Sequence, residues 1–407
     1  MRGKVLVLIQ GLIATAYLGG AAWAMALLSA QIEASQDSPA SLRRALSREA
    51  HCMGVANVDH LERLSQLDFA KSVEILREVV RLDPRRSDAW IRLGLLAEQE
   101  GELNAAERAF EIASRIDHRY LPAWTRANYY FRRGNPDLFW EWAKRAVSLA
   151  YDDVAPIFSL ADRFNQDPEY VLARLGDSTR LERAYFGYLL ERKRLAAART
   201  IALRLAALHD TRDFPRFASL TNWQLAAGDG EAALEAWNWF HDPPLDPVHG
   251  PLLFNSDLRF RPSGEGFDWA LRPHSLCPGI EAIWRPGQVE FSLSGRQPDD
   301  CILMSQPLIV SSRLRYRLRF QSRGPACPAH MGVDWDLDSR DGKGNANRWS
   351  VCEGETKPIP DQWQVHERIL PASDTKLVSL RLAYRRPPGA ERYAGSVWLR
   401  YFQLEIL

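Results

Sequence analysis

The sequence predicts a multidomain chain with an N-terminal transmembrane helix, an all-α solenoid and a C-terminal antiparallel β-sandwich. First, the run from Val5 to Ala30 carries no formal charge, and about 20 apolar residues suffice to cross a bilayer as a helix. Second, Trp124 follows Trp90 by 34 residues, a period typical of stacked helix-turn-helix units. Third, beyond about residue 250 short runs of alternating apolar residues are separated by Gly, Pro and Asp, as in half-buried strands.

These patterns divide the chain into four parts. We expect an anchor or signal at 1–30, a stalk helix and linker at 31–64, helical repeats at 65–245 and the sandwich at 250–407. The 52 basic and 51 acidic residues nearly balance and are interspersed, which argues against nucleic acid as a partner.

The N-terminal run also predicts a location. Arg2 and Lys4 precede it, and positive flanking charge stays cytoplasmic. We therefore expect contact with the membrane through residues 5–30, with the rest of the chain on the periplasmic side of the inner membrane. Cleavage as an export signal is the alternative, because Ala22-Trp23-Ala24 offers a small-x-small pattern, whereas the length of the run favours an uncleaved anchor.

The helical region carries a recognisable spacing. Trp90, Leu93, Gly94, Ala97, Ala106, Phe110 and Ala113 resemble the tetratricopeptide (TPR) repeat family. The resemblance extends to about four units, two of them degenerate, and implies a helical scaffold that binds a protein partner on its concave face. Five aromatic residues are candidates for this groove, although rings at helical spacing also fill gaps between helices: Tyr129, Tyr130, Trp140, Trp142 and Trp239.

Alternating strands define the last part of the chain. Arg313–Phe320 places four arginines on one face, and Met331–Asp338 places three aspartates outward. Such alternation favours an antiparallel sandwich with one face of each sheet buried. Together with four further runs, at 289–293, 302–310, 378–384 and 397–406, at least six strands are expected.

Four segments of this part resemble the jelly-roll carbohydrate-binding-module family. They are Asn255–Leu258, Gly266–Trp269, the stretch that starts at Trp363, and Val397–Leu404. Arg400 stands near a position where the family often has an acidic residue, which weakens the inference of the family's calcium site. Similar modules follow TPR repeats in membrane-anchored proteins linked to bacterial exopolysaccharide export and exosortase systems, and this chain resembles that group.

The resemblance implies sugar contacts by aromatic rings and polar side chains. The candidates are Trp284, Arg317, Asp334, Asp336, Trp349 and Trp363. Cross-strand ion pairs and ordinary buried tryptophans are the alternative reading. We expect no cofactor and no metal, because the aspartate run departs from a calcium loop at Ser339 and Asn345.

Four of the five cysteines lie in the predicted sandwich. Cys277, Cys301, Cys327 and Cys352 form an even set, consistent with two disulfides in an oxidising compartment. Three pairings are open, and Cys277 with Cys301 and Cys327 with Cys352 close the shortest loops. Cys52 would then be a free thiol or an intermolecular link.

Catalysis finds little support in the sequence. It has no nucleophile elbow, HExxH, P-loop or dinucleotide motif, and Asp334 and Asp336 would project side by side from a strand, where a sugar cannot lie between them. We expect a non-catalytic extracytoplasmic adaptor whose repeats bind a protein of an envelope polysaccharide or sorting system and whose sandwich binds glycan. A purely structural assembly factor and a glycan hydrolase are the alternatives.

Overall fold

The structure is a computed structural model of the chain. It describes residues 19–36, 38–53, 56–151, 153–272, 275–311, 314–324, 332–339, 349–350, 362–370, 376–386 and 388–407. Two compact units are present, one formed by residues 1–166 with 173–176 and the other by 167–172 with 177–407. Each is described by itself. The four ranges expected from the sequence do not coincide with these units and stay predictions.

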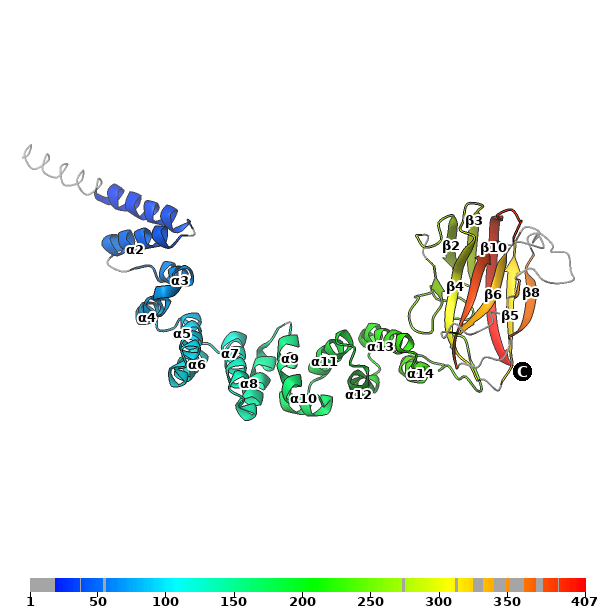
Figure 1. Ribbon diagram of the computed structural model, residues 1–407, viewed down its shortest axis with the longest axis horizontal. Coiled ribbons are helices and arrows are strands. Elements are labelled where there is room, and N and C mark those ends of the chain that lie inside the picture. Colours follow the sequence, from blue (N-terminus) through cyan, green and yellow to red (C-terminus); the bar gives the residue numbers. More distant parts are fainter. Residues whose placement is uncertain are drawn as a thin grey trace, which may run out of the picture. The chain divides into compact units, whose positions relative to one another are not determined.

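The described part of the first unit is helical (Figure 1). A helix at 19–34 is followed by α2 (Pro39–Met53), α3 (Val58–Leu67), a 3-10 turn η1 (Phe69–Lys71), α4 (Ser72–Leu82), α5 (Ser87–Gln99), α6 (Leu103–Ile116), α7 (Tyr120–Arg132), α8 (Pro136–Leu149) and α9 (Ala155–Phe164). The next helix, α10 (Pro168–Leu175), is divided between the two units.

The prediction of an N-terminal transmembrane helix is corrected. In the part of the chain that the structure describes, no helix is both long and apolar enough to span a bilayer. Residues 5–18 of the predicted span lie outside that part. The helix at 19–34 ends against α2, where Ala30 and Ala34 are buried in a core shared with Leu42 and Leu46.

The repeat spacing has a direct packing cause. Gly94 in α5 lies against Phe110 in α6, and a Cβ atom there would come within 2.5 Å of the Phe110 ring. Only glycine therefore lets the two helices of this hairpin approach so closely. The next hairpin is tied to it by Arg132 of α7, which donates to Glu98 at 2.6 and 2.8 Å across 34 residues.

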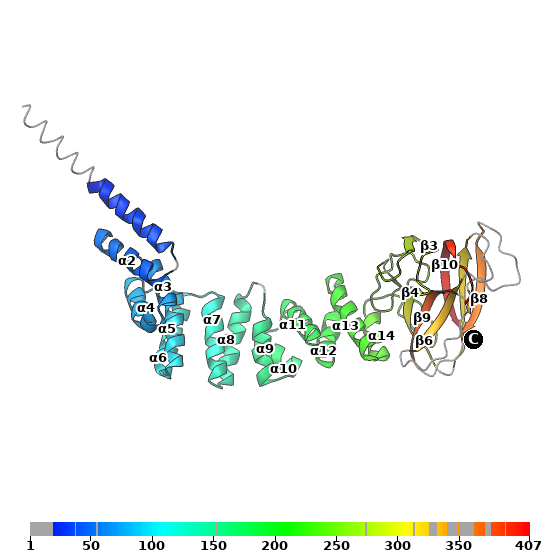
Figure 2. The same ribbon diagram turned by 45° about the horizontal axis from the view of Figure 1, so that its top comes forward.

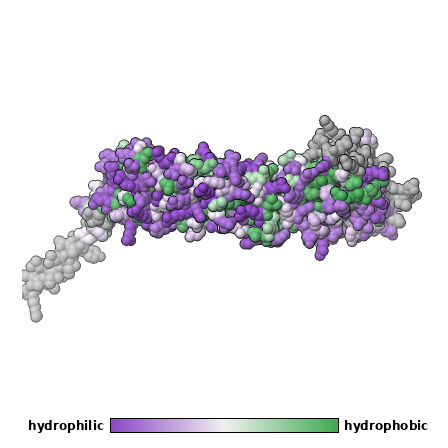
Figure 3. All heavy atoms as spheres, turned by 90° about the horizontal axis from the view of Figure 1, so that it is seen from below, coloured by the Kyte–Doolittle hydropathy of each residue, from purple (hydrophilic) through white to green (hydrophobic). Residues whose placement is uncertain are grey.

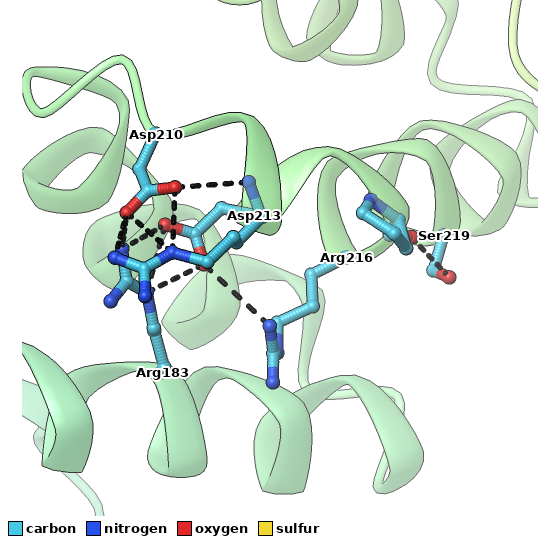
Figure 4. A network of polar contacts seen from close by, with 7 residues as sticks. Arg183, Asp210, Asp213, Arg216 and Ser219 are labelled. Carbon is cyan, nitrogen blue, oxygen red and sulfur yellow. Dashed lines mark hydrogen bonds and ion pairs between the residues drawn. The ribbon is translucent and has the colours of Figure 1, made fainter.

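Helices of the second unit continue this pattern with α11 (Thr179–Glu191), α12 (Leu195–Ala206), η2 (Thr211–Asp213), α13 (Phe214–Ala227) and α14 (Gly230–Asn238). Figure 4 shows Arg183 of α11 reaching the turn before α13, where it donates to Asp213 at 2.8–3.0 Å and to Asp210 at 2.6 Å. The Asp213 side chain is fully buried. Hydrogen bonds from Arg212 hold the pKa of Asp210 well below its usual range. This network joins α11 to α13.

The described residues of the sandwich form ten strands: β1 (Ala270–Leu271), β2 (Ile280–Arg285), β3 (Gln288–Ser294), β4 (Asp300–Ile309), β5 (Tyr316–Arg323), β6 (Val333–Ser339), β7 (Trp349–Ser350), β8 (Gln364–Leu370), β9 (Leu377–Arg385) and β10 (Ala394–Ile406). Sheet A has the order β1-β4-β9-β6-β7 and sheet B the order β2-β3-β10-β5-β8. All pairs are antiparallel. The predicted helical region and two-sheet antiparallel region are confirmed.

The core of the sandwich comes from the alternation within each strand. In β5, Tyr316, Leu318 and Phe320 are buried while the intervening residues are partly exposed. Inward residues of both sheets meet in one apolar cluster, in which Trp269 and Trp335 have no exposed surface. The pleat therefore sends the polar side chains to the outer faces of the two sheets.

Helix α14 packs directly on the sandwich, and both ribbon views show the two side by side (Figures 1 and 2). Trp237 of α14 is 2% exposed, with the rings of Phe254 and Phe267 at 5.1 and 6.2 Å. Gly266 donates its backbone N–H to the Oδ1 atom of Asn222 in α13 at 2.7 Å. The last helical hairpin and the sandwich thus share an apolar cluster and belong to one compact unit.

Candidate functional site

The aromatic residues proposed for a partner groove lie mostly inside the helical stack. Tyr129, Tyr130, Trp140 and Trp142 are 4–7% exposed. Trp239, at the C-terminal cap of α14, is half-buried and lies 5.8 Å from the ring of Phe217. These rings fill space between helices and offer a partner little surface.

A polar network fixes two of these rings. The Arg126 guanidinium lies 3.8 Å from the centre of the Trp142 ring and donates to the hydroxyls of Tyr130 and Ser114, each at 3.1 Å. Tyr130 donates in turn to Glu107 at 2.9 Å. Burial raises the pKa of the Tyr130 hydroxyl, so it remains a neutral hydrogen-bonding group.

The glycan contacts expected from the sequence are scattered over the sandwich. Trp284 packs on the core and donates its Nε1–H to the Leu258 carbonyl at 3.0 Å. Asp334 is half-buried on β6, and the backbone of Trp349 pairs with Trp335 in sheet A. These residues do not form one site with Arg317, which lies on sheet B.

Asp336 is fully buried within an ion-pair cluster on the outer face of sheet A. It accepts from Arg381 Nε at 2.7 Å and Nη2 at 3.2 Å, and also from Arg385. Burying a carboxylate demands such compensation. The two arginines also line a pocket of about 520 Å³, together with Arg272, Leu276, Cys277, Asp300, Cys301 and Ile302.

The wall of that pocket contains a disulfide bond. Cys277 and Cys301 are joined, with their Cα atoms 6.0 Å apart. The bond links the segment before β2 in sheet B to β4 in sheet A. This is one of the two bonds favoured by loop length in the sequence; Cys327 and Cys352 lie outside the described residues.

A different cluster forms on the outer face of sheet B. Arg323 of β5 lies opposite Trp398 of β10 in the strand register. Its guanidinium carbon is 5.0 Å from the centre of the Trp398 ring and 5.1 Å from that of Trp363, just before β8. The arginine therefore lies between two tryptophans contributed by the strands on either side, within cation–π distance of both.

Arg400, two residues after Trp398 on β10, also belongs to this cluster. Its guanidinium carbon lies 3.9 Å from the centre of the Trp363 ring and 4.9 Å from that of Tyr401, and its Nε donates to Gln321 at 2.8 Å. Tyr401 is 50% exposed. We call Trp363, Arg323, Trp398, Arg400 and Tyr401 the tryptophan–arginine face.

An irregularity in β10 shapes this face. The pairing of β10 with β5 shifts between Arg400 and Gln403, and Tyr401 has a φ of +52°. A residue other than glycine rarely adopts this left-handed backbone conformation. Bulges re-aim side chains and are common next to functional sites, and this one exposes Tyr401 beside Arg400.

Two other arginines on this surface of sheet B are paired with carboxylates. Arg319 lies 2.7 Å from Glu367, and Arg317 lies 3.7 Å from Glu367 and 3.8 Å from Glu405. Among the described residues, no carboxylate lies within 4.0 Å of the guanidinium groups of Arg323 or Arg400. The face thus combines exposed ring surface with two cations not paired to a described acid.

Sequence reasoning identified one of these five residues as a sugar contact, Trp363. Trp398 and Arg400 were visible as alternating positions within the last predicted strand, but nothing in the pattern links them to Arg323. Tyr401 breaks the alternation, because the bulge adds residues to one strand only.

The chain has similarities among solved structures but not among family models or curated proteins. No family model matches this sequence, and no curated protein matches it. Among solved structures, the chain is similar to YrrB, a TPR protein with an unusual peptide-binding site, at 13% identity over 49% of this chain and 90% of that one, with a TM-score of 0.24.

Two further similarities concern proteins that handle carbohydrate. The CBM22-1 xylan-binding domain of Paenibacillus barcinonensis Xyn10C matches at 12% identity over 34% of this chain and 85% of that one, with a TM-score of 0.23. An arabinose-bound α-L-arabinofuranosidase, MgGH51, matches at 15% identity over 42% of this chain with a TM-score of 0.26, and only 28% of that enzyme is covered.

Proposed function

We propose that the chain is a non-catalytic adaptor that works outside the cytoplasm. Its helical repeats bind a protein partner belonging to an envelope polysaccharide export, assembly or sorting system, and its sandwich binds glycan. The observation that carries the glycan part is the tryptophan–arginine face, on which three aromatic side chains and two arginines converge.

Sugars suit a surface of this composition. A pyranose ring presents apolar C–H groups on its faces and hydroxyls at its edge, so it can stack on an aromatic ring while its hydroxyls meet polar side chains. Tyr401 is exposed and Trp363 and Trp398 are half-buried. Arg400 and Gln321 supply donors and acceptors beside the rings.

The protein-binding part rests on the helical repeats and their resemblance to TPR arrays. In the view of Figure 3, the helical region is mostly hydrophilic, whereas apolar residues gather on the sandwich. Stacked repeats offer an extended surface along their length, which suits a protein or peptide better than a small molecule.

The location outside the cytoplasm is supported by the disulfide. Cys277 and Cys301 are bonded, and such bonds persist in oxidising compartments but are rare in the cytosol.

The absence of catalysis is proposed because the carboxylate of the candidate acid is enclosed. Asp336 is fully buried and accepts from both Arg381 and Arg385, so its oxygen atoms already face two guanidinium groups. Asp334 and Asp336 are next-but-one residues on β6, so a sugar cannot lie between their carboxylates as glycoside cleavage requires.

Binding of the full chain to a panel of neutral and acidic bacterial envelope polysaccharides tests the proposal. Tyr401→Ala and Trp398→Ala should each weaken binding about fivefold or more, taking as the scale the ~1–3 kcal/mol that a nucleobase gains by stacking on one aromatic ring. Phe260→Ala is the matched control, since Phe260 is 63% exposed and has an arginine, Arg259, 5.8 Å from its ring but lies outside the face.

Two results would contradict the proposal. Absence of binding to every polysaccharide would favour a purely structural assembly protein. Release of reducing ends from a bound polysaccharide, abolished by Asp334→Ala, would establish a hydrolase instead.

A further inference from the structure

The arginines of sheet B fall into two groups with different surroundings. Arg317 and Arg319 are neutralised by Glu367 and Glu405 at 2.7–4.0 Å. Arg323, on the same strand and the same face, lies between tryptophans. Its Nε atom is shielded from solvent and has no acceptor among the described residues. The rings therefore position this side chain, while its terminal N–H groups keep their capacity to donate.

An arginine side chain that aromatic rings hold in place is well suited to bind an anion. A guanidinium presents its donors in a planar fork that matches a carboxylate, and stacking on rings leaves that fork free. Arg323 and Arg400 lie on neighbouring strands, opposite Trp398 and Gln321 respectively. They are diagonal neighbours, about 7–8 Å apart along the sheet, so they can meet two anionic groups of one polymer.

The two arginines of the tryptophan–arginine face outnumber the one acidic residue beside it. Glu290 lies opposite Trp398 on the far side from Arg323, and no ion pair links it to either arginine of the face among the described residues. The nearest paired arginine, Arg319, keeps Glu367 at 2.7 Å. The positive charge of the tryptophan–arginine face is thus not cancelled by the acids of the same sheet.

We propose that the tryptophan–arginine face selects a carboxylate-bearing polysaccharide, with sugar rings stacked on Trp363, Trp398 and Tyr401 and carboxylates paired with Arg323 and Arg400. This inference rests on the proposed glycan-binding function and names its ligand class. A neutral glycan would leave both guanidinium groups without an anion, and only the stacking energy would remain.

The test measures affinities of the full chain for polygalacturonate and alginate, and for the same polymers after their carboxylates have been reduced to hydroxymethyl groups. We expect at least tenfold weaker binding of the reduced polymers. Binding of the acidic polymers should also weaken as NaCl rises from 50 to about 300 mM, because exposed ion pairs are screened by salt.

Variants separate the two groups of arginines. Arg323→Gln and Arg400→Gln should each lower affinity for the acidic polymers about tenfold and leave the residual affinity for the reduced polymers nearly unchanged. Arg317→Gln is the matched control, because it removes an arginine from the same face whose charge is already paired, and it should stay within twofold of the parent. Thermal unfolding of each variant confirms that the sandwich is intact.

Three outcomes would overturn the inference. Equal affinity for acidic and reduced polymers would leave glycan binding in place but remove the selectivity for carboxylates. Tighter binding to single-stranded DNA than to either acidic polymer would assign the face to nucleic acid. Failure of every polysaccharide to bind, neutral or acidic, would overturn the proposed function as well.

Discussion

Single residues of the sandwich are placed by contacts that cross several strands. His366 of β8 points inward, where its ring stacks on Phe320 with centres 5.0 Å apart and its Nε2 lies 2.8 Å from the Ser322 hydroxyl. Burial, with a further contribution from Arg368, lowers the pKa of His366 to about 4 from an ordinary value of 6.5. The folded protein therefore favours the neutral ring.

The pH dependence of stability follows from this shift. Between pH 6.5 and about 4 the unfolded chain binds a proton at His366 that the folded chain does not, so acidification destabilises the fold through that window. The contribution of His366 is fully present above pH 6.5. The difference between 6.5 and about 4 corresponds to ~3.4 kcal/mol at ~1.4 kcal/mol per pKa unit, and solvent screening of the half-buried ring reduces it to about 2–3 kcal/mol. In chemical denaturation across this range, His366→Gln should flatten the pH dependence. An unchanged slope in the variant would contradict the assignment.

The sequence does not show which of the candidate side chains are buried. Aromatic residues at helical spacing can face a groove or a core, and Tyr129 and Trp142 face the core. The outward aspartates of β6 were expected to be accessible, yet Asp336 is buried beneath Arg381 and Arg385. Those arginines lie on β9, more than 40 residues away in the sequence, so local alternation could not reveal them.

The strands were largely predictable from the sequence where apolar and polar residues alternate regularly. The alternating runs at 289–293, 302–310 and 378–384 correspond to β3, β4 and β9. β2 (Ile280–Arg285) was not expected, because its sequence alternates poorly and its residues are only partly buried. The bulge of β10 also left no signal, since it is defined by its pairing with β5.

An ion pair between helical hairpins leads to a prediction about the free energy of unfolding. Arg183 of α11 and Asp213, at the start of α13, form a close pair whose carboxylate is fully buried (Figure 4). Asp213→Ala removes a buried acceptor of Arg183 and leaves it with Asp210 alone. The variant should lower the free energy of unfolding by about 1.5–3 kcal/mol, the usual value for a lost hydrogen bond between charged groups.

The matched control is Glu235→Ala, which removes the partner of Arg199. Both side chains of that pair are more than 40% exposed, and exposed pairs contribute about 0–1 kcal/mol. Urea denaturation measures both variants. An equal loss of unfolding free energy in Asp213→Ala and Glu235→Ala would mean that the Arg183 pair does not join α11 to α13 as described.

Within the second unit as a whole, the last helical hairpin and the sandwich should behave as one cooperative structure. Trp237 of α14 packs against Phe254 and Phe267, and an added Cβ at Gly266 would lie 2.1 Å from the Trp237 ring. The shared cluster also includes Leu225, Leu245 and Leu377. The sandwich therefore covers apolar surface that the helices alone would expose.

Two glycine substitutions test this coupling. Gly266 and Gly264 both have positive φ, +55° and +74°, so alanine at either position is strained by about 1–2 kcal/mol. Only Gly266→Ala also collides with Trp237; at Gly264 the nearest atom is 3.8 Å away. Gly266→Ala should cost about 1–3 kcal/mol more, the usual range for overpacking.

Calorimetry of both variants in the full chain measures the difference. The expected result for Gly266→Ala is a larger drop in the unfolding temperature of the transition that contains the sandwich. Similar drops in the two variants would show that Trp237 does not couple the hairpin to the sandwich.

The central claim is that the outer face of sheet B is the surface of the sandwich that binds glycan. Hydrogen–deuterium exchange of the full chain, with and without a bound acidic polysaccharide, tests it most directly. The account predicts slower exchange in β5, β10 and β8, at Tyr316–Arg323, Ala394–Ile406 and Gln364–Leu370, with no change in β6 and β9. Protection confined to Val333–Ser339 and Leu377–Arg385 would place the ligand on sheet A and contradict it.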